Sequence, residues 1–395
     1  MNLDFTEDEV LFREQARTWL AENLPTEERP PDGQAMREFD LAWQRTLFEG
    51  GWAGINWPVE YGGKGLNDIQ QMIWYEEFAR ARPTFSLNNS CTFVGNNHGG
   101  PTLIVSGTDE QKSFHLPKIL QGEVVWCQGF SEPGAGSDLA SLSCKAIIDG
   151  DELVVNGQKI WTSYAHVADF QELLVRTDSS GPKHKGISWV ICDMTTPGIE
   201  IREITTMSHV NDFCEVFYDD VRIPLTNVVG ELNEGWRVTM TTLSFERGTA
   251  FMADQVDLAA VVEDLITKAA TTPRPLRGGV MLDDDNIAQR LATARAEVAA
   301  LRAMTIAGIS RTARTGVPGA EGSMIRLFHG ELHQRVYRLA LEIIGNDALR
   351  LSSIDGADAW TGAYLQSFAY TIGGGTTDIQ RNIVGERVLG LPRNK

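Results

Sequence analysis

The stretch QGFSEPGAGSD, residues 128–138, marks the point at which the hydrophobic periodicity of the sequence changes. Apolar residues recur with the period of a helix before it and with the two-residue period of a strand after it. Its proline and glycines keep the loop open, so that backbone amides and the hydroxyls of Ser131 and Ser137 can face one ligand. Such groups bind carbonyl and phosphate oxygens without a net charge. The alternative is a plain turn between two domains.

Three regions follow from this change of period. Residues 1–124 carry helical periodicity, and a capping box of Thr6 with Glu9 predicts the first helix start. Residues 125–234 consist of short β-rich runs separated by turns, which predicts an antiparallel barrel or sandwich of about six strands. Residues 235–395 return to long helical stretches, which predicts a four-helix bundle. The predicted fold class is therefore α+β, with a helical domain, a β domain and a bundle in this order.

Individual elements can also be predicted from the pattern. Asn156-Gly157 between two β-rich runs predicts a tight hairpin. The predicted helices span residues 34–50, 67–82, 109–120, 235–268, 285–316, 321–346 and 377–389.

Composition narrows the class of protein. The 395 residues include 35 basic and 53 acidic side chains, a formal charge of −18, which repels nucleic acid and anionic membrane surfaces. There is no run of 18 apolar residues, so no membrane span is expected. The acidic start MNLDFTEDEV does not resemble a secretion signal, which predicts a cytoplasmic protein. Five cysteines without CxxC spacing predict buried, reduced thiols rather than disulfides or a zinc site.

A second candidate site segment is KIWTS, residues 159–163, at the end of a predicted strand. An indole face at Trp161 beside the hydroxyls of Thr162 and Ser163 suits a flat heteroaromatic ring, which needs stacking on its face and donors at its edge. The alternative is that Trp161 belongs to the barrel core.

A third segment is IGGGTTDIQ, residues 372–380. Consecutive glycines allow the backbone to approach a bulky ligand closely and to adopt positive φ. The segment contains no evident catalytic acid or base at its glycines.

These segments, together with YGGKG (61–65), GTDEQK (107–112), FYDDVRIP (217–224), GELNEGW (230–236) and GGTTDIQRNIVGERVLGLPR (374–393), resemble the acyl-CoA dehydrogenase family along nearly the whole chain. The resemblance implies three domains that enclose FAD, with an acyl-CoA thioester beside the flavin ring. It implies α,β-dehydrogenation to a trans-2-enoyl-CoA and an electron-transferring flavoprotein as acceptor. It also implies an oligomer: a homotetramer, a dimer, or a heteromer with a related chain.

Site residues are carried over by position. Positions that match the family's flavin contacts are Gln128, Phe130, Ser131, Gly136, Ser137, Trp161, Ser163, Thr376 and Asp378, with Thr162 added as a neighbouring hydroxyl. Positions that match contacts to the adenine end, often of a neighbouring subunit's FAD, are Glu342, Gly345 and Asn346. The resemblance assigns substrate contacts to Ser137, Arg247 and the backbone amide of Gly374, the last for the thioester oxygen.

The catalytic base needs a separate argument, because many members carry a glutamate where this sequence has Gly374. Another branch keeps its glutamate on the first bundle helix, where this chain reads LSFERGTA, residues 243–250. The same-face neighbours of Glu246 are mostly apolar or small, and desolvation raises the pKa of a carboxyl toward that of a useful general base. The alternative is a glutamate on a solvated helix face. The glycine at 374 favours Glu246 as the group that removes the α-proton while the β-hydride passes to flavin N5.

Departures from the family leave alternatives open. The usual Arg-x-x-Phe-Gly word is replaced by RPLRGGVMLDDD, in which Arg274 or Arg277 is the candidate substitute. An acyl-CoA oxidase and a non-catalytic subunit of a heteromer are the alternative functions. The segment SLNNSCTFVGNNHGG, residues 86–100, is rich in small residues, which favours a branched or cyclic, even steroid-derived, acyl chain.

The sequence gives no metal site. His329 and His333 lie one helical turn apart but do not form an HExxH word, so they are interpreted as polar surface.

Overall fold

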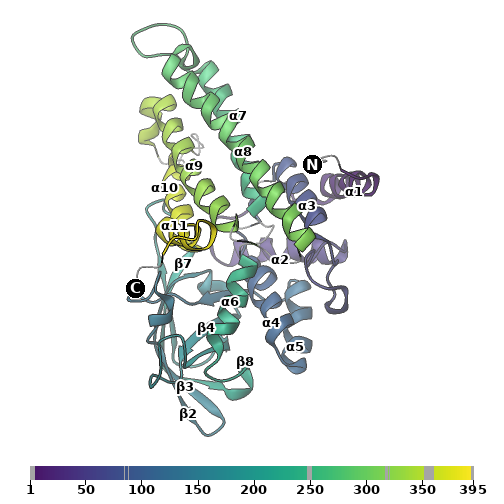
Figure 1. The fold of residues 1–395 in the computed structure, drawn as a ribbon, viewed down its shortest axis with the longest axis vertical. Coiled ribbons are helices and arrows are strands. Elements are labelled where there is room, and N and C mark those ends of the chain that lie inside the picture. Colours follow the sequence, from purple (N-terminus) through teal and green to yellow (C-terminus); the bar gives the residue numbers. More distant parts are fainter. Residues whose placement is uncertain are drawn as a thin grey trace.

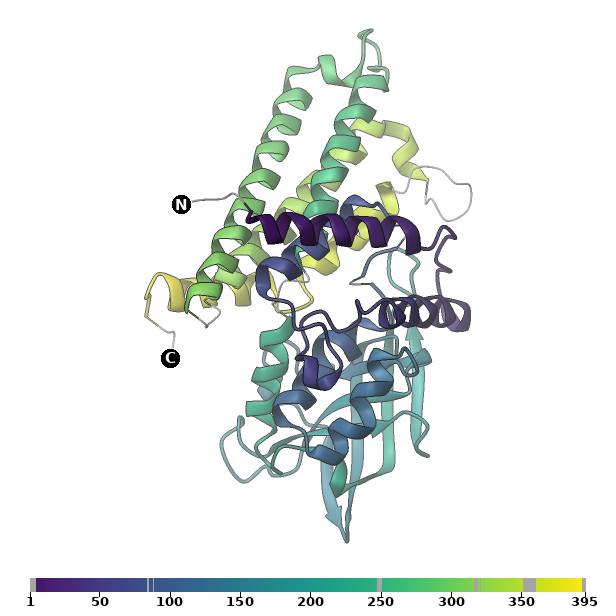
Figure 2. The ribbon, with the colours of Figure 1, turned by 90° about the vertical axis from the view of Figure 1, so that its right-hand side faces the viewer.

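The computed structural model describes residues 5–83, 85–87, 89–246, 251–315, 319, 321–350 and 360–392. The predicted order of a helical region, a sheet region and a second helical region is confirmed. Figure 1 shows the long C-terminal helices at one end of the molecule and the sheet at the other. In Figure 2, α1 and α2 cross the molecule between these two ends.

The N-terminal helices begin where side chains cap their free amides. Thr6 accepts from the amide of Glu9, whose carboxylate accepts from the amide of Thr6, as the capping box predicted. Thr108 and Gln111 form a second such box. The helices are α1 (Glu7–Asn23), α2 (Gly33–Glu49), α3 (Asp68–Arg80), α4 (Gly100–Ser106) and α5 (Asp109–Leu120), with the π-helix η2 (Gly95–Gly99) directly before α4.

Buried charges on α3 join the N-terminal helices to the bundle. Glu76 is fully buried and pairs with Arg13 of α1 at 3.0 Å and with Arg302 of α8 at 2.6 Å. Removing one partner of a buried pair leaves a desolvated charge, which is strongly destabilising. The pairs therefore connect α3 to both α1 and α8.

The middle region is one eight-stranded sheet in the described part of the chain, with the order β6-β7-β3-β2-β4-β5-β8 and β1 added in parallel beside β4. Its interior is a separate apolar cluster that includes Leu153, Val190 and Val216. The strands are β1 (Trp126–Gly129), β2 (Lys145–Asp149), β3 (Glu152–Ser163), β4 (Phe170–Arg176), β5 (Ile187–Asp193), β6 (Ile199–Ile204), β7 (Phe213–Pro224) and β8 (Val228–Val229).

The hairpin predicted at Asn156-Gly157 is wrong. Strand β3 runs through both residues, and the pairing with β7 shifts register there, which is a bulge. A Cβ at Gly157 would lie 2.8 Å from the Cα of Cys144, so the close approach of the neighbouring backbone requires glycine. Asn156 instead bonds across the bulge to Asp220.

The C-terminal bundle is built from three long helices, with shorter ones packed on α9. Helix α6 does not join them, since it packs against β5 and α4. Helix α10 was not predicted. The helices are α6 (Gly235–Glu246), α7 (Phe251–Thr271), α8 (Asp285–Thr315), α9 (Glu321–Ile344), α10 (Trp360–Ser367) and α11 (Thr377–Ile383).

All five cysteines are buried and unbonded, as predicted. Within the described ranges, no helix combines the length and the apolar character needed to cross a membrane.

Candidate active site

The loop that leaves β1 is fixed from beneath by a buried ion pair. Lys159 Nζ lies 2.7 Å from Glu132 Oε1 and donates to the carbonyl of Phe130 at 3.1 Å. The same carboxylate accepts from the backbone amides of Ser143 and Cys144. Burial alone raises the pKa of Glu132, but the Lys159 charge and these hydrogen bonds outweigh it and hold the pKa below its usual range. The Glu132 carboxylate therefore stays ionised and holds the loop.

A bulge in β3 brings the two candidate segments together. Pairing with β7 is interrupted between Lys159 and Thr162, and the amide of Ile160 donates instead to the carbonyl of Ser131 at 3.0 Å. Trp161 takes the left-handed conformation with φ 62°, which is uncommon for a bulky residue. Its indole is 55% exposed, so it does not belong to the barrel core. The strand end thus presents a flat aromatic face beside the loop of residues 128–138.

Hydroxyl groups lie on both sides of this contact. Ser131 and Ser163 are half-buried, and Ser137 is exposed at the tip of the loop beside Gly136. The hydroxyl of Thr162 is fully buried and has no hydrogen-bond partner among the described residues. Phe130 is buried beneath the loop. Buried polar groups without partners are rare. Because the Thr162 hydroxyl has no exposed surface, the structure does not support the predicted contact of Thr162 with a ligand.

Sequence reasoning missed a polar cluster behind the loop. Gln128 donates to Glu172 Oε1 at 2.7 Å and lies 3.2 Å from Nδ1 of His98. Both His98 and Glu172 are buried. The available signal was a glutamate inside the apolar run FQELLV, residues 170–175, because a charged residue is almost never fully buried without a partner.

Helix α6 runs antiparallel to α4 toward η2. Gly230, just before α6, donates to the carbonyl of Ser106 at the end of α4, whereas Thr242 meets Thr102 at 2.9 Å in a buried hydroxyl contact. Helix α6 also contacts η2 and ends at Glu246, one turn beyond Thr242. The backbone of Glu246 therefore lies near η2, which carries His98. The side chain of Glu246 and all of Arg247 lie outside the described residues.

The glycine segment, residues 372–376, is held by its backbone. Gln380 is buried and donates to the carbonyls of Gly374 and Gly375 at 3.0 and 3.3 Å. Thr376 caps α11 by accepting from the amide of Ile379. Gly374 has φ 66° and is exposed, which leaves its amide open to an approaching group. Asp378, in the first turn of α11, is exposed and pairs with Arg381.

The three residues assigned to the adenine end lie on the surface of the bundle. Glu342 is exposed near the end of α9, and both of its carboxylate oxygens accept hydrogen bonds from Arg290 of α8. Gly345 and Asn346 follow in the next turn and are exposed. Within a single chain, these three residues lie on the bundle. The residues assigned to the flavin ring, Gln128, Ser131 and Trp161, lie instead in the sheet region.

The two arginines considered as substitutes differ. Arg274 is engaged within its own loop by Asp284 at 3.0 Å. Arg277 is exposed and has no ion pair within the described ranges.

The interpretation of His329 and His333 as polar surface is wrong. Burial lowers the pKa of His333 to about 4, and His329 is 3% exposed. His333 packs against the ring of Tyr370 with a centroid distance of 4.2 Å. Glu331, which lies two residues from each histidine in sequence, pairs with Arg381 of α11. No group of three possible metal ligands occurs in the described part of the chain.

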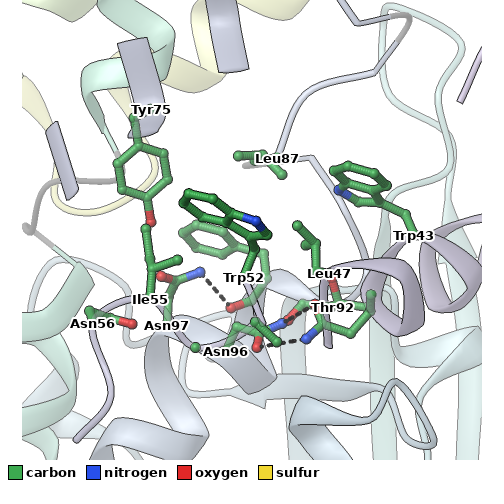
Figure 3. Close-up of a pocket in the computed structure, with 14 residues that line it drawn as sticks. Trp43, Leu47, Trp52, Ile55, Asn56, Tyr75, Leu87, Thr92, Asn96 and Asn97 are labelled. Atoms are coloured by element: carbon green, nitrogen blue, oxygen red, sulfur yellow. Dashed lines mark hydrogen bonds between the residues drawn. The ribbon is translucent and has the colours of Figure 1, made fainter. Parts of the chain in front are cut away.

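A cavity of about 70 Å³ lies inside the N-terminal helices (Figure 3). Its walls are mostly aromatic and aliphatic, and Leu87, Thr92 and Phe93 come from the segment 86–100. Asn96 and Asn97 of η2 close one side, so the cavity adjoins the element that α6 contacts. Its other apolar walls are Trp43, Leu47, Trp52, Ile55 and Tyr75.

Sequence models of the acyl-CoA dehydrogenase N-terminal, middle and C-terminal domains match residues 6–123, 127–221 and 233–389. The acyl-CoA dehydrogenase IpdE1 of Mycobacterium tuberculosis is 39% identical over 390 residues, which cover 97% of each chain. A structure described as the Tcur3481-Tcur3483 steroid ACAD has a TM-score of 0.85 at 32% identity and covers 100% of each chain. The ChsE4-ChsE5 complex from Mycobacterium tuberculosis has a TM-score of 0.84 at 33% identity, again over 100% of each chain.

Proposed function

The chain belongs to the acyl-CoA dehydrogenase family of FAD-dependent oxidoreductases, and on this premise we propose that it removes the α- and β-hydrogens of a cyclic acyl group carried as a CoA thioester. The observation that carries the proposal is the bulged end of β3, where an exposed indole stands beside the hydroxyl-bearing loop of residues 128–138. This arrangement suits a flat heteroaromatic ring flanked by polar groups.

The residues present fit a flavin. The indole of Trp161 offers a stacking face, and Ser131 and Ser163 offer half-buried hydroxyls, whereas the hydroxyl of Thr162 is fully buried and is not open to a ligand. Gly136 has open space around it, so the loop tip with Ser137 admits phosphate oxygens close to its backbone. When bound, FAD supplies the acceptor for the hydride. Thr376 and Asp378 are assigned as further flavin contacts, and Glu342, Gly345 and Asn346 are assigned to the adenine end of a partner subunit's FAD.

Glu246 is assigned as the group that takes the α-proton. Helix α6 contacts η2, so the last turn of α6 lies beside the element that carries buried His98. Gly374 has no side chain that could serve instead, but its exposed amide suits the developing charge on the thioester oxygen. Arg247 is assigned to the CoA moiety by its position beside Glu246.

A cyclic substrate is supported by the small residues of the segment 86–100 and by a similar structure. The cavity next to η2 adds no support, because its volume of about 70 Å³ is far below the roughly 300 Å³ or more of a typical ligand pocket. One similar structure is described as a steroid ACAD. Both similar structures pair two different proteins, which supports assembly of this chain with a related one.

The test is purification of the chain alone and with a related chain, followed by measurement of bound FAD and of flavin bleaching by a panel of CoA thioesters. We expect bleaching by thioesters of cyclic acids at rates well above those for straight chains of four to eight carbons. Reduction of an electron-transferring flavoprotein, compared with formation of peroxide, separates a dehydrogenase from an oxidase. A flavin-free protein in both preparations would contradict the proposal.

A further inference from the structure

The polar cluster of Gln128, Glu172 and His98 offers an acceptor to each of the two hydrogens on the side-chain amide of Gln128. Gln128 on β1 lies directly opposite Glu172 on β4 in the parallel pairing, and its Nε2 donates to Glu172 Oε1 at 2.7 Å. The same Nε2 lies 3.2 Å from Nδ1 of His98, which comes from η2. An amide nitrogen carries two hydrogens. The carboxylate of Glu172 accepts one, and Nδ1 of His98 accepts the other in the neutral tautomer that carries its hydrogen on Nε2.

These two contacts determine the orientation of the amide. A carboxylate has no hydrogen to give, so it must face the nitrogen of Gln128 and not the oxygen. Glu172 is fully buried and His98 is 5% exposed, so neither acceptor can turn away into water. An amide is planar, and fixing both hydrogens on its nitrogen therefore fixes the direction of its oxygen.

The carbonyl oxygen of Gln128 is then left for a ligand. Gln128 is half-buried at the end of β1, and its Oε1 receives no hydrogen bond from the described residues. It belongs to the segment of residues 128–138, three residues before Ser131. The site therefore contains one acceptor of fixed direction among several hydroxyls, which can rotate.

We propose that Glu172 and His98 are positioning residues that hold Gln128 as a hydrogen-bond acceptor for the single N–H of the oxidised isoalloxazine ring, at its N3 position. The inference rests on the proposed flavin site and adds the edge by which the ring is recognised. A fixed acceptor selects that edge because the other ring heteroatoms of the oxidised flavin only accept. The ring is thereby oriented before substrate binds.

The first test uses the wild-type protein alone. FAD is removed from the purified holoprotein, and the dissociation constants of FAD and of N3-methyl-FAD are measured by flavin fluorescence. Since the methyl group removes the donor and leaves a buried acceptor unpaired, we expect roughly tenfold to a hundredfold weaker binding of the methylated flavin. Equal binding of the two flavins would overturn the inference while leaving the flavin site intact.

Variants separate loss of the hydrogen bond from simple crowding by the methyl group. In Glu172→Leu the amide of Gln128 is free to turn, so the preference for FAD should shrink to less than roughly threefold. Glu172→Gln keeps a carbonyl acceptor and should restore the preference. Gln171→Leu is the matched control, because Gln171 is equally buried on β4 but bonds to Tyr218 at 2.5 Å.

The variants also have a clear opposing result. A folded Glu172→Leu protein that keeps the wild-type preference would refute the positioning role. If Glu172→Leu does not fold, the wild-type comparison of the two flavins still decides. A protein that binds neither flavin would refute the proposed flavin site itself.

Discussion

The strand edge, formed by residues 128–138 and 159–163, and the glycine segment, residues 372–376, are held in opposite ways. A buried ion pair of Lys159 and Glu132 supports the strand edge. The glycine segment is largely exposed, and its carbonyls receive hydrogen bonds from Arg326 and Gln380. One region is fixed by a desolvated ion pair and the other by side-chain hydrogen bonds to its backbone carbonyls, one of them from the guanidinium of Arg326.

This difference indicates a division of roles. A strand edge fixed from beneath suits the recognition of a rigid ring, because its donors and its aromatic face need no reorganisation when the ring binds. A segment of exposed glycines allows close approach but carries no acid at Gly374. The proton acceptor must then come from a third place, and we assign it to the end of α6.

Breaking the ion pair should have the largest effect on stability. Lys159→Met leaves the carboxylate of Glu132 buried beside an apolar side chain, and we expect a loss of about 3–5 kcal/mol in the free energy of unfolding. The control is Lys185→Met, which breaks an exposed pair with Glu234 and should cost less than about 1 kcal/mol. Chemical denaturation measures both, and equal losses would show that burial does not strengthen the ion pair that supports the strand edge.

Adding one methyl group sharpens the comparison. In Gly157→Ala the new Cβ would lie 2.8 Å from the Cα of Cys144, and we expect a loss of about 1–3 kcal/mol. In Gly373→Ala its nearest contact would be 3.5 Å away, so the change should stay within about 0.5 kcal/mol. Gly157 lies on β3, two residues before the strand edge. Thermal unfolding of the two variants gives the comparison, and similar melting temperatures would show that β3 beside the strand edge is no tighter than the glycine segment.

A smaller effect on stability is expected when the pH changes the charge of Asp212, a residue next to the strand edge. The carbonyl of Asp212 accepts from the amide of Tyr164 at 2.7 Å, and burial raises the pKa of its carboxyl from the ordinary 3.8 to about 6. A raised carboxyl pKa stabilises the folded state below pH 3.8, and this stabilisation is lost as the pH rises through about 6.

Between these pH values the wild type should therefore lose about 1–2 kcal/mol relative to Asp212→Asn, after allowance for partial exposure of the group. Urea unfolding of both proteins at pH 4 and pH 7 measures the change. A difference that is the same at both values would contradict the burial of this carboxyl.

Removal of the Trp161 indole should have the smallest effect, a change in the dissociation constant of FAD. Trp161→Ala removes one stacking face, and we expect FAD to bind roughly tenfold more weakly. Ile372→Ala, which trims an apolar side chain 63% exposed in the glycine segment, should change the dissociation constant less than roughly threefold. Fluorescence titration measures both, and equal losses would place ring recognition in both regions.

Much of the fold could be predicted from local sequence. The capping boxes at Thr6 and Thr108 need only residues three apart, which explains why these helix starts are visible in the sequence. The turn at Asn156-Gly157 was predicted wrongly, because a bulge depends on the pairing of β3 with β7 about sixty residues away. Local turn chemistry cannot report such a pairing.

The site shows the same limit. The exposure of Trp161 agrees with its predicted place at a strand end, but the left-handed backbone that turns the indole outward depends on a bond between Ile160 and Ser131. His98 and Glu172 were missed because they are 30 and 44 residues from Gln128, and only the folded sheet and η2 bring them together.

The most direct test of the central claim, that α6 and not the glycine segment supplies the proton acceptor, is the rate of flavin bleaching by substrate without oxygen. Glu263→Gln, an exposed change on α7, serves as control. For Glu246→Gln we predict normal FAD content and bleaching slower by a factor of about 10² to 10⁴, as for the loss of a general base. Bleaching by Glu246→Gln at the wild-type rate would contradict the account.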